Sequence, residues 1–74
     1  MEVKIGVRDV PRELVLESDE TPDAITAAVE EAIVKNTLLR LVDDRGRMVI
    51  VPGHQIGYLE LGAPRSHKVG FGSV

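Results

Sequence analysis

At 74 residues the chain has room for one domain, and a domain of this size buries only about 60% of the surface of its unfolded form. It contains no cysteine, which excludes a disulfide framework and thiolate metal sites. No apolar run is long enough to span a bilayer, and no secretory signal opens the chain. We therefore expect a cytoplasmic protein that does not cross a membrane.

The net charge of −3 is unevenly distributed along the chain. Residues 1–37 hold nine acidic and four basic side chains, whereas residues 38–74 hold three acidic and five basic ones. Dedicated nucleic-acid-binding domains present a strongly basic patch. An acidic first half with a mildly basic second half makes nucleic acid an unexpected partner.

The first seventeen residues predict two strands. In MEVKIGV, apolar residues alternate with Glu2, Lys4 and Gly6, which is typical of a half-buried strand. Pro11 lacks a backbone donor and favours a turn, and ELVLE (13–17) reads as a second strand. We expect the two strands to form a hairpin.

A helix is predicted next, in SDETPDAITAAVEEAIVKN. Thr21 is a suitable N-cap, and Pro22 fits the first helical position because its missing N–H would have no partner there. Asn36 is a plausible left-handed stop. The apolar residues follow the spacing of one buried stripe, namely Ile25, Ala28, Val29, Ala32 and Ile33.

Three further strands are expected at Leu38–Val42, 47–51 and Gln55–Leu61, separated by DDRG and VPGHQ turns. The predicted class is α+β, with a single helix packed on a small, mainly antiparallel sheet in the order β-β-α-β-β-β. We assign residues 1–62 to this single domain. The Gly-, Pro- and Ser-rich residues 63–74 are expected to form a flexible C-terminal tail.

The last three strands are apolar on both faces. One predicted set is Leu39, Leu41, Met48, Ile50, Leu59 and Leu61. The other is Leu38, Arg40, Val42, Val49, Val51, Ile56, Tyr58 and Glu60. Sequence does not fix the register, so which set meets the helix stays open. Either set would leave a patch of several hundred Å², which is large for a monomer.

Three explanations for the second apolar face stay open. The small sheet can curl, with the tail covering part of it. A homodimer can pack through the face or an edge strand, which would also relieve the thin core. A different protein can bind there. Replacing Val49 or Ile56 with lysine distinguishes the interpretations. The variant should be a soluble monomer if the residue lies in an interface, and it should unfold if the residue lies in the core.

No catalytic, metal-binding or cofactor-binding arrangement emerges. Ser66 and His67 are adjacent in the tail, where they are not preorganised for nucleophilic catalysis. The carboxylates of ESDETPD lack the spacing of a calcium loop, and GFG (70–72) lacks the rest of a phosphate-binding motif. We therefore expect a non-enzymatic protein with no metal or cofactor.

Two features suggest contacts with other molecules. Phe71, the one phenylalanine, lies in the tail with Arg65 and Lys68. Three interpretations stay open: Phe71 docks into a partner or subunit, it folds back over the sheet, or it belongs to a frayed, soluble end. Tyr58 and Arg40 form a weak RNA-binding pattern, because RNA-recognition sheets present two or more aromatic side chains.

The segments MEVKIGVRDVPRELVLESDETPDAI, VPGHQIGYLELG and the terminal KVGFG resemble a family of small, uncharacterised actinobacterial proteins, classed as a domain of unknown function. Some of its members bear an automatic ATP-binding label, but no nucleotide-binding motif occurs in this chain. The resemblance implies a cytoplasmic bacterial protein and supplies no site residues.

The sequence thus predicts a small interaction module that self-associates, as a homodimer, through an apolar sheet face or edge. It can also dock a protein partner through its tail. The candidate contact residues are Val49, Val51, Ile56, Tyr58, Phe71, Arg65 and Lys68. The alternative is an RNA- or nucleoprotein-associated accessory protein that uses Arg40, Arg45, Arg47, Arg65 and Lys68.

Overall fold

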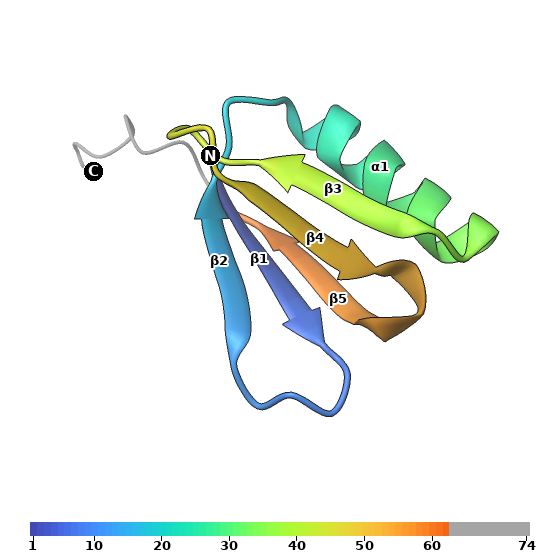
Figure 1. The fold of residues 1–74 in the computed structure, drawn as a ribbon. Coiled ribbons are helices and arrows are strands. Elements are labelled where there is room, and N and C mark those ends of the chain that lie inside the picture. The colour runs from blue at the N-terminus through green and yellow to red at the C-terminus, as the bar shows by residue number, and fades with distance from the viewer. Residues whose placement is uncertain (63–74) are drawn as a thin grey trace.

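The computed structural model describes residues 1–62 of the chain (Figure 1). The predictions for residues 63–74, including those for Arg65, Lys68 and Phe71, lie outside the described residues.

One helix and five strands follow each other in the predicted order, which confirms the α+β class. A 3₁₀ turn, η1, joins the last two strands. The elements are β1 (Glu2–Val7), β2 (Glu13–Glu17), α1 (Pro22–Lys35), β3 (Leu38–Val42), β4 (Met48–Pro52), η1 (Gly53–Gln55) and β5 (Ile56–Leu61).

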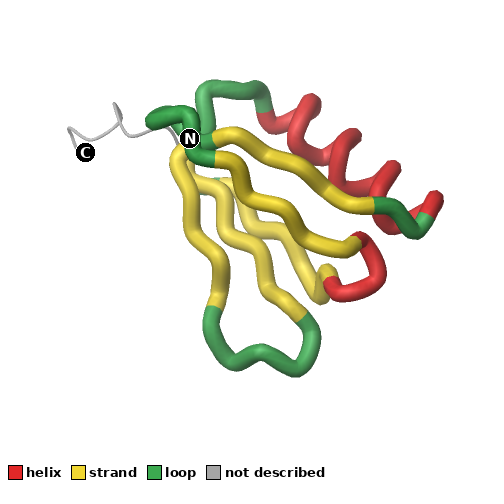
Figure 2. The backbone as a smooth tube through the Cα atoms, in the orientation of Figure 1, coloured by secondary structure: helices red, strands yellow, loops and turns green. Residues whose placement is uncertain are grey.

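The strands divide between two antiparallel sheets, a separation that the sequence did not indicate. The first sheet has the order β2-β1-β5, and the second consists of β3 and β4. The chain passes from the second sheet to the first through η1, where Arg8 N donates to Gln55 O at 2.7 Å. Figure 2 places the β1–β2 connection at the end of the molecule opposite the β3–β4 turn.

The hydrophobic core lies between the two sheets and α1. The helix packs against β3, β5 and η1. The helix and strands β1 to β4 each bury apolar residues of one face, because helical and strand side chains recur with periods of 3.6 and 2, and β5 packs partly buried apolar side chains against them. The buried apolar residues are Val3, Ile5, Leu16, Ile25, Val29, Ala32, Leu39, Leu41 and Val51.

Both predicted ends of α1 are confirmed. The Thr21 hydroxyl accepts a hydrogen bond from Ala24 N at 3.1 Å, which satisfies one orphan donor of the first turn. Asn36 ends the helix in the left-handed region, with φ of 54°. Asp23 in the first turn and Lys35 in the last complement the helix dipole.

Gly53 fixes the position of η1 beneath the end of α1. It is buried, and its N–H donates to Thr37 O at 2.8 Å. A Cβ atom at this position would lie 2.1 Å from Ala32 O and 2.8 Å from Thr37 O. Both obstacles are backbone atoms that cannot move aside alone, so only glycine allows this approach.

We predict that Gly53→Ala lowers the free energy of unfolding by about 1–3 kcal/mol, because the new methyl group overpacks the contact between η1 and α1. Urea denaturation followed by circular dichroism measures the change. His54→Ala, an exposed position next along the chain, is the matched control and should unfold near the native midpoint. Equal midpoints for the native chain and Gly53→Ala would contradict the prediction.

Candidate interaction face of the second sheet

The second sheet presents an apolar face to the outside. Its register pairs Val42 with Met48, Arg40 with Ile50, and Leu38 with Pro52, so these six side chains share one side of the sheet. We call this group the outer face. Its large apolar members are about half exposed: Leu38 by 47%, Val42 by 43%, Met48 by 54% and Ile50 by 50%.

The predicted pairing of faces in this hairpin is wrong. Met48 and Ile50 were grouped with Leu39 and Leu41, but the register pairs Leu39 with Val51, and Leu41 with Val49. A register shifted by one residue exchanges the two sides of a strand. Met48 and Ile50 therefore face outward.

The expected contact residues Val49 and Val51 consequently lie on the inner side of the hairpin, and Ile56 lies on β5 of the first sheet. Val51 is 3% exposed and belongs to the core, and Val49 and Ile56 pack against that core. The structure places Leu38, Val42, Met48 and Ile50 outside instead.

The turn between β3 and β4 accounts for this register. Asp43 Oδ1 accepts hydrogen bonds from Arg45 N at 2.9 Å and from Arg47 N at 2.7 Å. Gly46 has φ of 83°, the left-handed conformation that completes a three-residue hairpin loop. Because three residues separate Asp43 from Arg47, odd-numbered residues pair with odd-numbered ones along the hairpin. Counting this loop as three residues would have grouped Met48 and Ile50 with Leu38 and Val42 from sequence alone.

The Asp43 carboxylate is buried, with its second oxygen 2.9 Å from Arg47 Nε. Desolvation raises the pKa of Asp43. The hydrogen bonds from the backbone N–H groups of Arg47 and Arg45, together with the Arg47 guanidinium, outweigh it and hold this pKa below its ordinary value of 3.8. The charged carboxylate therefore stabilises the turn.

The basic residues of the alternative nucleic-acid interpretation lie among carboxylates. A cleft of about 530 Å³ at the β3–β4 turn is lined by Arg45 and Arg47, but also by Glu17, Asp43 and Asp44. Arg40 stands alone as a cation on the outer face. Binding of nucleic acid stays a prediction, and Arg65 and Lys68 lie outside the described residues.

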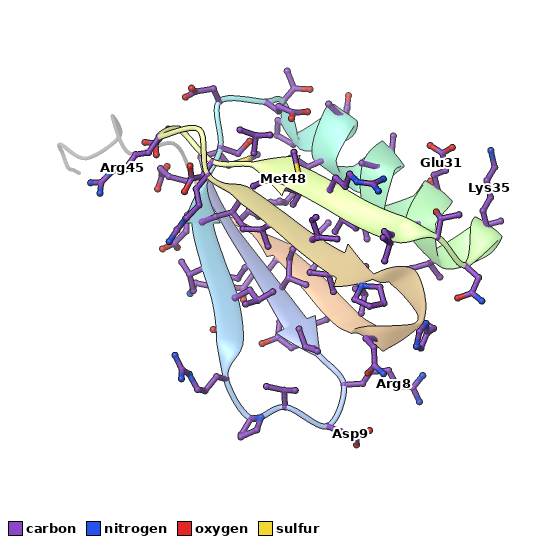
Figure 3. All side chains as sticks on the ribbon, in the orientation of Figure 1. Arg8, Asp9, Glu31, Lys35, Arg45 and Met48 are labelled. Atoms are coloured by element: carbon purple, nitrogen blue, oxygen red, sulfur yellow. The ribbon has the colours of Figure 1, made fainter. Side chains whose placement is uncertain are left out.

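The outer face continues toward α1. Leu38 and Arg40 line a second cleft of about 240 Å³ together with Ala28 and Glu31 of the helix. Figure 3 labels Glu31 and Lys35 on α1 and Met48 on β4, with Arg45 near the β3–β4 turn. Charged side chains thus flank the outer face in two places: Glu31 and Lys35 on the side of α1, and Arg45 at the end with the β3–β4 turn.

Tyr58 does not belong to the outer face. It lies on the side of the first sheet that is turned away from the core, where it pairs with Gly6. Its ring covers Gly6, because a Cβ there would lie 2.0 Å from Tyr58 Cε2. Its hydroxyl donates to Glu13 Oε2 on β2, and this hydrogen bond is the main cause that raises the pKa of Tyr58 above 10.0.

The part of the chain that the structure describes contains no cluster of three or more His, Asp or Glu side chains suited to a metal ion. Among residues 1–62 no helix has both the length and the apolar character needed to cross a membrane.

The structure defines a small α+β domain with one helix and two antiparallel sheets. The model of the family described as "Protein of unknown function (DUF3107)" matches residues 1–72, and the chain belongs to this family. The predicted membership in a family of unknown function is thereby confirmed. No curated protein matches the chain significantly.

We predict that Glu13→Gln lowers the pKa of Tyr58 toward its ordinary value, because the phenolate no longer faces a carboxylate. The near-ultraviolet absorbance of phenolate measures the titration, and Tyr58 is the single tyrosine in a chain without tryptophan. Glu30→Gln on the exposed side of α1 is the control and should leave the curve unchanged. Coincident curves for the native and Glu13→Gln chains would refute the assignment.

We predict that Asp43→Asn lowers the urea midpoint at neutral pH and that its difference from the native chain shrinks in acid. A carboxyl group with a lowered folded-state pKa stabilises the fold above its unfolded pKa, and this stabilisation is lost as pH falls through the folded pKa. The pH range in which this stabilisation is lost therefore extends below the ordinary pKa value of 3.8. Urea titrations at several pH values test this, with the exposed Asp19→Asn as control. A difference that is independent of pH would be inconsistent with the charged-turn explanation.

Proposed function

We propose that this protein is a non-enzymatic interaction module that self-associates as a homodimer through the outer face. The observation that carries the proposal is the set of half-exposed apolar side chains on one side of a two-stranded sheet. Five of the six outer-face positions are apolar, and Arg40 is the sixth. The expected cytoplasmic location and actinobacterial source stay predictions.

The small size of the chain supports a second copy of the chain as the partner that covers the outer face. A sheet of two strands is marginally stable unless its faces are covered, and the core of a 74-residue chain is thin. Stacking two outer faces about a two-fold axis would bury the same residues of both copies in one step. The two sheets would then pack at the usual separation of about 10 Å.

Ile50 tests the proposal because it is half exposed and opposite Arg40 on the outer face. We predict that Ile50→Lys weakens the dimer tenfold or more, since it places a charge in the apolar contact. Sedimentation velocity over a range of concentrations measures the dissociation constant. Circular dichroism verifies that the variant is folded.

Val15→Lys is the matched control. Val15 is similarly exposed, at 51%, but lies on β2 of the first sheet. It should leave the dissociation constant unchanged. A native chain that remains monomeric at millimolar concentration, or equal weakening by both variants, would overturn the proposal.

A further inference from the structure

One edge of β4 carries main-chain groups that face no other strand of residues 1–62. Asp43 N donates to Arg47 O, so the hydrogen-bonded pairs of the β3–β4 hairpin fall at odd-numbered residues. In an antiparallel ladder the intervening residues turn their N–H and C=O groups the other way. Met48 and Ile50 therefore direct these groups away from β3, and within the described chain β4 pairs with β3 alone.

The β4 edge differs from the other strand edges among residues 1–62. Proteins protect exposed edges with charges, prolines, bulges or a covering element. On β2, Glu13 and Glu17 carry charge, and Glu17 O accepts from Asp44 N at 2.9 Å. Strands β3 and β5 pack against α1, and Figure 1 shows β3 between β4 and the helix. In contrast, β4 has no charged residue, and Pro52 lies only at its end.

We propose that β4 pairs antiparallel with β4 of a second copy, so that two hairpins form one four-stranded sheet. The pairing is centred on Val49, which places Met48 opposite Ile50 of the second copy. This register uses the outward N–H and C=O groups of Met48 and Ile50 in both copies. It requires no hydrogen bond from Pro52, which has no N–H to donate.

The composition of β4 favours an identical strand as its partner. Antiparallel pairing about a two-fold axis sets the strand against itself, so a charge near the axis would face a like charge. The strand reads MVIVP and carries no charge. Its β-branched residues Val49, Ile50 and Val51 are of the type that packs well across paired strands.

The pairing also joins the outer faces of the two copies. Residues opposite each other in a ladder share a side of the sheet, so Met48 and Ile50 of both copies lie on one continuous surface. The outer face of one copy exposes roughly 400 Å² of apolar area, within the range of the largest patch on an ordinary monomer. A standard interface buries about 800 Å² per partner. Two joined outer faces supply an area of that size.

The edge contact and the outer-face contact have perpendicular two-fold axes. The axis of the edge contact is normal to the sheet, whereas the axis of the face contact is parallel to it. Together the two contacts close the assembly at four chains with dihedral symmetry. The four-chain assembly therefore rests on the proposed homodimer, to which the edge pairing adds a second contact.

A single engineered cysteine tests the pairing directly, because the native chain has none. Val49 would lie opposite its own copy in a non-hydrogen-bonded pair, whose Cα atoms are about 4.5 Å apart and thus within disulfide range. We expect Val49→Cys to form a disulfide-linked dimer on oxidation. Val49 packs against the core on the inner side, so stacked outer faces cannot bring these cysteines together.

Val15→Cys is the matched control for the cross-link. Val15 is exposed by 51% and lies on β2 of the first sheet, so its thiol is accessible but far from the β4 edge. It should form linked dimers at least tenfold more slowly than Val49→Cys. Equal rates for the two variants would overturn the edge pairing.

A backbone variant tests the same contact without cross-linking. The Met48 N–H is directed away from β3, so Met48→Pro removes a donor of the edge contact and leaves the β3–β4 ladder intact. In sedimentation velocity we expect native tetramers, and an edge contact weakened tenfold or more in Met48→Pro, which stops at dimers. Met48→Leu keeps the N–H and is the matched control. Circular dichroism verifies that each variant is folded.

The outcomes separate the two contacts. Leu38→Lys alters the outer face on β3 and should leave the cross-link of Val49→Cys in place. A native dimer that Ile50→Lys dissociates, without a cross-link in Val49→Cys, would overturn the edge pairing and leave the proposed function standing. A native chain that stops at dimers and cross-links as Val49→Cys would overturn the outer-face contact and retain the edge pairing. A native monomer would overturn both.

Discussion

The hydrogen bonds of the Asp43 carboxylate hold the turn that decides which residues of β3 and β4 share a side of the second sheet. By accepting from Arg45 N and Arg47 N, Asp43 holds a three-residue loop that ends at Gly46 in the left-handed conformation. A loop of this length pairs residues of equal parity across β3 and β4. Leu39, Leu41, Val49 and Val51 therefore turn inward, and Leu38, Val42, Met48 and Ile50 turn outward. A loop one residue longer or shorter would reverse one strand relative to the other.

The outer face follows from this register together with the small number of elements. A single helix can cover the core on one side only, and α1 does so by packing against β3, β5 and η1. Nothing in residues 1–62 is left to cover the opposite side of β3 and β4. Apolar side chains that a larger domain would bury thus stay about half exposed. Their arrangement in one cross-strand group, with Arg40 as the one cation, is the physical basis for proposing a homodimer.

The family assignment adds the extent of the matched region, residues 1–72, and no activity. Function therefore rests on the surface itself. The first sheet exposes Glu13 and Tyr58 in a mutual hydrogen bond, which uses the one aromatic ring of the described residues for a cross-strand contact over Gly6. The apolar outer face, with its half-exposed side chains, is the surface on which the proposed self-association rests.

The sequence alone determined the class of fold, the order of the elements and both ends of the helix. These features depend on neighbours along the chain: alternation in MEVKIGV, the Thr21 hydroxyl beside Pro22, and Asn36 as a left-handed stop. Tertiary structure decided the division into two sheets, the close approach of Gly53 to Ala32, and the identity of the outer face. These depend on how segments meet across space, and both sides of β3 and β4 were apolar enough to face the core. The loop held by Asp43 decided which residues share a side, and packing against α1 and the first sheet decided which side faces the core.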